Sequence, residues 1–242
     1  MRGEEETISV VRDIPKLEDR DKKTTIMHKT DIMSCVYDFK TNLIFTGSHD
    51  GELLAWHFET GFTKYSLHDK DKTCTSKDYV KDSKSVDCLI IMQKERLLLS
   101  ASADGLIRFW DLNDLSVENP RVYTMNAFNF SFEEDQLTSV TIAREHVFPK
   151  DKKYEKSSDR ILTSCTGGKI KCWDISKTNF RTDKDPAETM RISWYIQAHR
   201  KIAGSISSLT VVENYKSDRF VISASTDNNI LVHRISTGVK IG

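Results

Sequence analysis

Short apolar stretches alternate with turn residues along most of the chain, and one pattern recurs. Its clearest copy is SASADGLIRFWD at residues 100–111, which follows the apolar run Leu97–Leu99. After the Asp104-Gly105 pair, Leu106, Arg108 and Trp110 would fall on one face of a strand, and Ile107 and Phe109 on the other. This pair suits a two-residue hairpin turn, because glycine adopts positive φ without steric cost. The pattern therefore predicts strand, tight turn and strand.

Three further copies share the same layout. Each opens with Ser or Thr, has a turn pair at the same offset and closes on Trp or, once, on His. They occupy residues 46–56, 163–173 and 223–233. Apolar strands are expected before the copies at 32–39, 86–92, 137–143 and 206–212, and fourth strands at 62–67, 121–128 and 191–197. Four-stranded units repeated along a chain are typical of a β-propeller, so we predict an all-β fold with about four blades.

These copies also set the expected domain organisation. Residues 26–242 are predicted to form the propeller, with copies near 31–67, 84–128, 135–198 and 204–242. Residues 1–25 contain the short apolar run ISVVRDI among charged residues. We interpret this segment either as a strand of a preceding blade or as a charged tail.

The recurring hairpins resemble those of the WD-repeat (WD40) family, whose naming dipeptide occurs as Trp110-Asp111 and Trp173-Asp174. The resemblance implies a buried hydrogen-bonded tetrad in each blade, formed by His, Ser or Thr, Asp and Trp. Such a tetrad satisfies a buried indole N–H and hydroxyl. The matching residues are His28, Thr46, Asp50 and Trp56; Ser100, Asp104 and Trp110; Thr163 and Trp173; and His199, Ser223 and Asp227. The second copy lacks the His, the third has Gly167 in place of Asp, and the fourth has His233 in place of Trp.

The length limits how much of a propeller is present. WD repeats take about 40–45 residues each, and this chain has 242 residues in wider-spaced copies. Propellers of four blades exist, but the family that the sequence resembles normally closes its ring with about seven. We therefore expect a partial propeller that is completed by missing sequence or by another chain.

Composition excludes several classes of partner. The chain has 36 basic and 36 acidic side chains, so no long-range attraction to nucleic acid or to an anionic membrane is indicated. It has no run of about 18 apolar residues and no apolar signal-peptide core at its start. Its five cysteines are odd in number and form no C-x-x-C pair, which favours reduced thiols and a cytoplasmic location.

No residue pattern of catalysis or cofactor binding is evident. The sequence contains no HExxH, Walker or G-x-S-x-G element. Residues 69–80 open like a calcium loop, but Cys74 and Val80 stand where the sharp-turn glycine and the bidentate glutamate are needed. We therefore expect no enzyme, no metal, no cofactor and no small-molecule substrate. The long loops at 68–83, 145–159 and 176–188 are either partner-binding segments or plain surface loops.

The expected function is a non-enzymatic scaffold that binds other proteins through a rigid ring. Within the family, residues 26–112 resemble WD-repeat proteins of motile cilia. This resemblance implies a structural component of the cytoskeleton, located in the axoneme, with tubulin of the doublet microtubules and neighbouring axonemal proteins as partners. The alternative is an adaptor in another assembly, such as a ubiquitin ligase, a nuclear complex or a trafficking complex.

Overall fold

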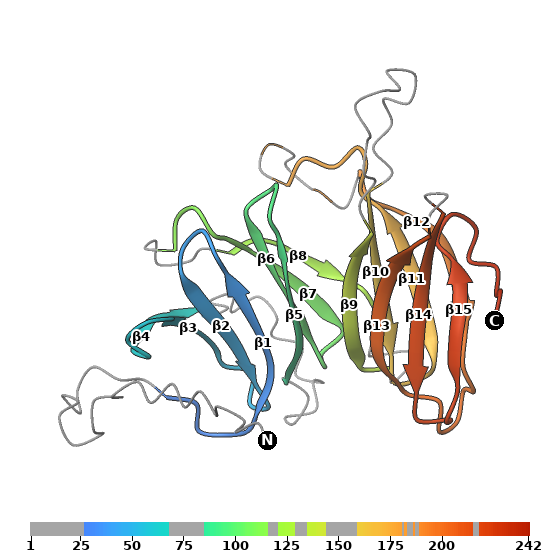
Figure 1. The fold of residues 1–242 in the computed structure, drawn as a ribbon, viewed down its shortest axis with the longest axis horizontal. Coiled ribbons are helices and arrows are strands. Elements are labelled where there is room, and N and C mark those ends of the chain that lie inside the picture. Colours follow the sequence, from blue (N-terminus) through green and yellow to red (C-terminus); the bar gives the residue numbers. More distant parts are fainter. Residues whose placement is uncertain are drawn as a thin grey trace, which may run out of the picture.

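The computed structural model describes fifteen strands in four antiparallel sheets (Figure 1). It describes residues 27–67, 85–115, 121–128, 135–143, 159–180, 182, 186, 189–214 and 218–242.

We name the sheets blades A to D in chain order. Blade A contains β1 (Ile32–Asp38), β2 (Leu43–Ser48), β3 (Leu53–His57) and β4 (Thr63–Leu67). Blade B contains β5 (Val86–Met92), β6 (Leu97–Ser102), β7 (Leu106–Asp111) and β8 (Arg121–Asn126). Blade C contains β9 (Leu137–Ala143), β10 (Arg160–Cys165), β11 (Lys169–Asp174) and β12 (Arg191–Gln197). Blade D contains β13 (Ile206–Glu213), β14 (Arg219–Ser225) and β15 (Ile230–Arg234).

The blades stand side by side in chain order, with their first strands next to one another. β1 lies beside β5, β5 beside β9, and β9 beside β13. Within each blade the strands pair in sequence order. This is the arrangement of blades in a β-propeller that the sequence predicted, and the propeller is open.

The hairpin turns between second and third strands use positive backbone angles, as the turn pairs predicted. Gly51, Gly105 and Gly168 have φ of 87°, 82° and 74°, and Asn228 has φ of 64° at the same offset in blade D. Glycine adopts this conformation freely, and asparagine adopts it more readily than most residues. The recurring turns therefore have a common backbone geometry.

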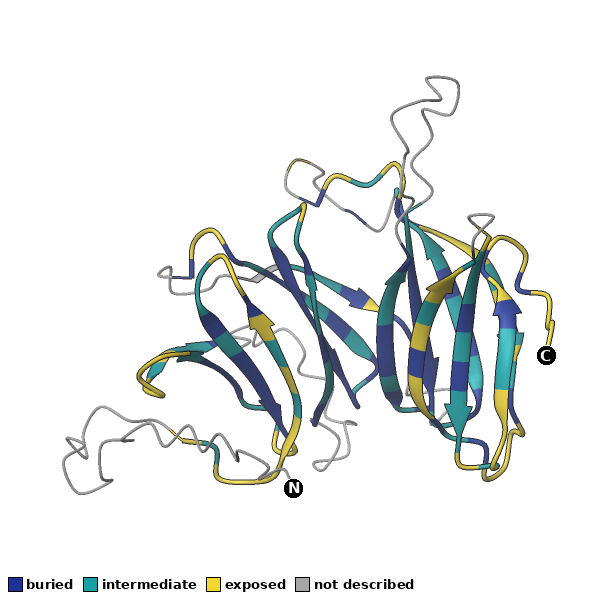
Figure 2. Ribbon diagram, in the orientation of Figure 1, coloured by how far each residue is buried: buried dark blue, intermediate teal, exposed yellow. Residues whose placement is uncertain are grey.

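The core lies between the blades (Figure 2). One apolar cluster joins blades A and B, a second joins B and C, and a third joins C and D. β6 is covered on both faces, so Leu97, Leu98 and Leu99 are all fully buried. A strand buried on both faces has a continuous apolar run in place of alternation, which explains this stretch of the sequence.

Blade D ends differently from the other three. Its sheet has three strands, but residues 238–242 lie along the free edge of β15. The amide of Val232 donates to the Gly242 carbonyl at 2.8 Å, and the amide of Arg234 donates to the Val239 carbonyl at 2.9 Å. This segment forms a single β-bridge, between His233 and Lys240, and is not a full fourth strand.

Several predicted segments lie outside the described residues. They are the 1–25 segment, all of the 68–83 loop, nearly all of 145–159 and parts of 176–188. In the part of the chain that the structure describes, no helix has the length and hydropathy required to span a membrane.

Candidate functional site: the polar tetrads between blades

A Trp side chain on the third strand donates to a hydroxyl on the second strand in three blades. The Nε1–Oγ distances are 2.6 Å for Trp56 and Thr46, 2.9 Å for Trp110 and Ser100, and 3.2 Å for Trp173 and Thr163. Each pair is separated by ten residues, because the hairpin folds at the same offset in each copy. The predicted Ser/Thr and Trp residues thus meet in blades A, B and C.

Blade A adds the histidine but not the aspartate. His28 Nε2 lies 2.7 Å from Thr46 Oγ1, as the resemblance implied. Asp50, however, accepts a hydrogen bond from the Ser48 hydroxyl at 2.6 Å, and this bond lowers the pKa of Asp50. His28 Nδ1 instead lies 3.6 Å from the carboxylate of Glu52. The expectation that Asp50 is hydrogen-bonded to His28 was wrong, because the Asp50 side chain accepts a hydrogen bond within its own turn.

Blade B completes its turn with an arginine. Asp104 pairs with Arg108, four residues later, at 2.6 Å, and also accepts from the amide of Leu106. Both side chains are only slightly exposed. The pair lies within one hairpin. The Asp104 carboxylate in the turn of blade B therefore has hydrogen-bond partners although this copy lacks the histidine.

Blade C has replaced the turn aspartate by one from outside the hairpin. A Cβ on Gly167 would lie 2.1 Å from Asp135 Oδ1, so the missing side chain leaves space for the Asp135 carboxylate. Asp135 also forms an ion pair with Lys169 at 2.7 Å. Sequence reasoning missed Asp135. The available signal was the pairing of a glycine at the aspartate position with an acidic residue just before the first strand.

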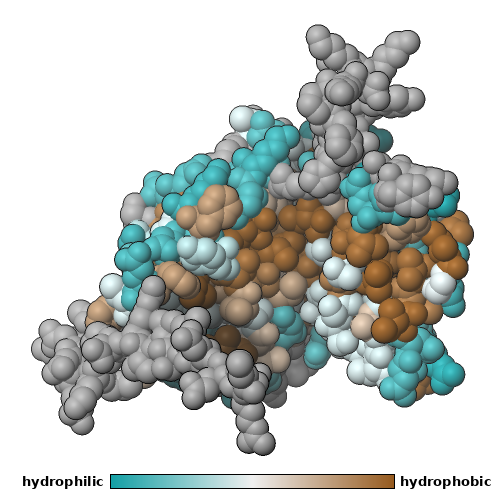
Figure 3. Space-filling view, viewed as in Figure 1, coloured by the Kyte–Doolittle hydropathy of each residue, from teal (hydrophilic) through white to brown (hydrophobic). Residues whose placement is uncertain are grey.

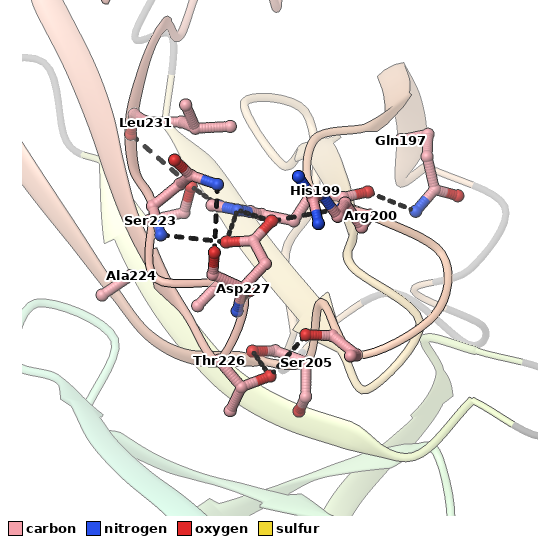
Figure 4. Close-up of polar contacts among 12 residues, drawn as sticks. Gln197, His199, Arg200, Ser205, Ser223, Ala224, Thr226, Asp227 and Leu231 are labelled. Carbon is pink, nitrogen blue, oxygen red and sulfur yellow. Dashed lines mark hydrogen bonds and ion pairs between the residues drawn. The ribbon is translucent and has the colours of Figure 1, made fainter.

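Blade D contains the most complete polar chain (Figure 4). His199 Nδ1 lies 3.1 Å from both carboxylate oxygens of Asp227, and its Nε2 lies 2.8 Å from Ser223 Oγ. Burial raises the pKa of Asp227, but hydrogen bonds from the amides of Arg200 and Asn229 and from His199 outweigh it and lower that pKa to about 2. The three predicted residues of this blade are therefore in contact.

His233 occupies the register position of the tryptophans. It pairs across the sheet with Val221, as Trp110 pairs with Leu98 in blade B. Its side chain is 3% exposed, and its Nδ1 has no hydrogen-bond partner. Burial lowers the pKa of His233, and the charges of His199 and Lys240 lower it further. These surroundings therefore disfavour the charged form of His233.

The Asp227–His199–Ser223 order is also the order of hydrogen bonds in a serine hydrolase. In such enzymes the hydroxyl must reach a substrate carbonyl. Ser223 is fully buried between blades, and its Oγ faces the carbonyl of Leu231 at 3.5 Å. The geometry thus satisfies buried polar groups, which is the structural role that the resemblance implied.

Two further polar contacts link neighbouring blades, and sequence reasoning found neither. Arg96 of blade B forms a two-pronged pair with Asp38 of blade A, at 2.9 and 2.6 Å. Burial raises the pKa of Asp38, but the hydrogen bond from Arg96 and others hold it well below its usual range. Lys171 of blade C donates to the Ala127 carbonyl at 2.9 Å and lies 4.2 Å from the ring centre of Phe128. These contacts add polar links to the apolar packing between blades A and B and between blades B and C.

The described cysteines and acidic groups lie apart from one another as far as metal binding is concerned. The four described cysteines, at positions 35, 88, 165 and 172, are free thiols. Burial raises the pKa of Cys165 and of Cys172 to about 12. Among the described residues, no group of three or more His, Cys, Asp or Glu side chains is arranged to hold a metal ion. The calcium-like segment at 69–80 lies outside the described residues.

Comparison with known proteins agrees with this architecture. Residues 20–57 and 72–111 match the family model "WD domain, G-beta repeat". The histone-binding protein MSI1 of Saccharomyces cerevisiae is 27% identical over 138 residues, which are 57% of this chain and 26% of that protein. The aligned part of this chain thus corresponds to about a quarter of that relative.

Solved structures show the same fold. The structure of U3-55K gives a TM-score of 0.60 at 15% identity, over 90% of this chain and 53% of that one. The RRP9 WD40 repeats give 0.59 at 15% identity, over 90% and 52%. The computationally designed Ika8 protein gives 0.56 at 17% identity, over 90% and 50%. This chain therefore spans about half of each, contains WD40 repeats, and folds into the blades of an open WD40 β-propeller.

Proposed function

We propose that the protein is a non-enzymatic scaffold that holds other proteins in a larger assembly. The observation that carries the proposal is that its most triad-like polar side chains are hydrogen-bonded to one another in the interior. The His, Ser and Asp side chains that lie in the order of a catalytic triad, His199, Ser223 and Asp227, are hydrogen-bonded to one another, and Ser223 is fully buried. A rigid ring of this kind presents its loops and edges to partners.

The more specific proposal is a structural component of the motile-cilium axoneme that contacts doublet microtubules or neighbouring axonemal proteins. Its support is the sequence resemblance within residues 26–112, which form blade A, most of blade B and the segments before them. In this region the pair between Asp38 and Arg96 joins the first two blades.

A second candidate is an adaptor in a multiprotein complex elsewhere in the cell. The observation that favours it is the 27% identity to a protein whose name records histone binding. For this chain, such a role would place the protein with histones or in another nuclear complex.

Cell fractionation with an antibody to the protein separates these candidates. Retention with salt-washed axonemes is the expected result and supports the axonemal role. Recovery with chromatin, together with direct binding to purified histones, would replace it with the second candidate. Migration in a soluble extract as the free chain, with no associated protein, would overturn the scaffold proposal itself.

A test for turnover addresses the non-enzymatic part. The protein is incubated with activated esters, and the rate is compared with that of Ser223→Ala. We expect no rate above background for either chain. A rate that the substitution abolishes, while the melting curve stays unchanged, would contradict the proposal.

A further inference from the structure

We call the face of a blade that points along the chain order its forward face, and the opposite face its back face. Where a neighbouring blade exists, the forward face contacts the next blade and the back face contacts the previous one. In blades A, B and C the forward face is buried by the following blade. Blade D is the last blade that the structure describes, and its forward face can be compared with the other three at matched register positions. This comparison shows what kind of surface the uncovered face is.

The centre of the forward face has an equivalent residue in each blade. On the second strand it is Phe45, Leu99, Leu162 and Ile222, in blades A to D. The first three are fully buried, whereas Ile222 is partly exposed. On the third strand the equivalent residues are Leu53, Ile107, Ile170 and Ile230. The first three are 2%, 0% and 0% exposed, and Ile230 is 69% exposed.

The neighbouring positions of blade D repeat those of blade C. Thr210, Ile222 and Val232 form one row across blade D, at the register of Thr141, Leu162 and Cys172 in blade C. Val212 extends the apolar surface and is 39% exposed. Figure 3 shows hydrophobic residues gathered at the end of the molecule that β13–β15 form. Blade D thus has a blade-docking surface without a blade on it.

The back face of blade A is also uncovered. Cys35 on β1 occupies the register of Leu89, Val140 and Leu209 in the other three blades. Those three side chains are 6%, 2% and 7% exposed, because a preceding blade covers them, but Cys35 is exposed. Tyr37, on the same face, is 45% exposed.

We propose that a second copy of this chain docks head to tail on these surfaces, with blade D of each copy packed against blade A of the other. The contact continues an interface that the chain already forms three times, between A and B, B and C, and C and D. Two such contacts are symmetry-related, and they close a ring of eight blades, which is within the size range of known propellers.

The size of the related structures supports a ring made of two copies. This chain covers 50%, 53% and 52% of the Ika8, U3-55K and RRP9 chains, which have the same fold. Two copies therefore have about the length of one of those chains. The proposal is independent of the proposed cellular function, because it concerns only how the purified chain assembles.

The test measures the mass of the purified 242-residue chain in solution by light scattering after gel filtration and by sedimentation. One chain has a mass of 27.8 kDa, and we expect twice that value at micromolar concentration. A mass of one chain would overturn the proposal and leave the face to another occupant. Larger polymers would overturn the closed ring, because a head-to-tail contact that does not close generates filaments.

Substitutions on the two faces locate the contact. Ile230→Glu places an unpaired carboxylate in the interface, and we expect it to weaken dimerisation on the order of 100-fold or more. Ile230 is exposed in the single chain, so this variant should fold, which circular dichroism verifies. Ile202→Glu is the matched control, because Ile202 is 85% exposed and lies outside both faces. Equal masses for the two variants would overturn the proposal.

Cys35→Glu distinguishes a head-to-tail contact from a contact between two D blades. In the head-to-tail dimer it disrupts association as Ile230→Glu does. When the two variants are mixed, one contact again has both natural faces, so we expect association to recover in part. If Cys35→Glu leaves the dimer intact, the pairing is not head to tail and the proposal is wrong.

Discussion

Blades B and D place different side chains at the same position and stabilise the neighbouring hydroxyl in different ways. In blade B, Trp110 is 2% exposed and donates to Ser100. In blade D the tryptophan position holds His233, which makes no such bond, and Ser223 is instead held by His199. The hydrogen-bond partner of the second-strand hydroxyl therefore comes either from the same hairpin or from the segment that precedes the blade.

This difference separates two kinds of stabilisation. Trp110 belongs to the apolar cluster between blades A and B, so blade B relies mainly on the burial of a large ring. Blade D replaces much of that apolar area with a chain of polar groups, of which Asp227 is charged over most of the pH range. The first kind should be sensitive to truncation, and the second to acid and to the loss of a single polar partner.

The largest expected effect is the truncation of the blade B ring. Trp110→Ala should lower the free energy of unfolding by about 3–5 kcal/mol, because it removes a large buried aromatic side chain and leaves a cavity. His233→Ala, at the same position of blade D, should cost on the order of 1 kcal/mol. Urea denaturation followed by fluorescence and circular dichroism measures both values. Equal losses would show that the two blades are not stabilised differently.

The residues that sequence reasoning placed well are those fixed by local spacing. Trp110 and Ser100 are ten residues apart in one hairpin, so the turn geometry alone brings them together. The same argument located the four positive-φ turns and, with the repeat, the order of the sheets. A repeating hairpin needs no long-range information to specify these contacts.

The residues that it misplaced depend on contacts between segments or on competing local bonds. Asp135 reaches the blade C turn from another segment, and Arg96 meets Asp38 across a blade boundary. Neither contact follows from a spacing within one copy. Asp50 was assigned to His28 by family pattern, but the Ser48 hydroxyl two residues away provides a closer partner. Short polar side chains often bond within their own turn, and that bond prevailed here.

The second prediction removes the blade D partner. His199→Ala should lower the free energy of unfolding by about 1–3 kcal/mol, because Ser223 and Asp227 lose the ring that lies between them. His49→Ala is the matched control, since His49 is exposed, and it should change stability by less than about 0.5 kcal/mol. Thermal and urea unfolding measure both. A His199 variant as stable as its control would remove the polar chain as the stabilising feature of blade D.

The third prediction concerns pH and His233. Burial lowers the pKa of His233 in the folded chain, so below the ordinary histidine value of about 6.5 the unfolded chain binds a proton that the folded chain does not. Stability should therefore fall as the pH falls from about 6.5, by at most about 1.4 kcal/mol per pH unit for this group. It should not change through this group above that pH.

His233→Gln isolates this contribution, because glutamine is polar but does not titrate. Urea midpoints of the natural chain and the variant are compared between pH 7.5 and pH 5, values chosen to lie about one unit or more on either side of 6.5. The two curves should diverge only on the acid side, where the natural chain loses more stability. Parallel curves would mean that His233 accepts its proton as readily in the folded chain as in the unfolded one.

The smallest expected effects are at the hairpin turns, where blade B uses glycine and blade D uses asparagine. Gly105 has φ of 82°, and a Cβ there would lie 2.3 Å from the Phe128 carbonyl oxygen. Gly105→Ala should therefore cost about 1–2 kcal/mol, from both the left-handed backbone and the collision. Asn228 already accommodates a Cβ at φ of 64°, so Asn228→Ala should lose only the asparagine preference, less than about 1 kcal/mol. Urea denaturation of the two variants compares these losses, and an Asn228→Ala loss as large as that of Gly105→Ala would show that backbone strain, and not the approach of Phe128, determines which residue each turn requires.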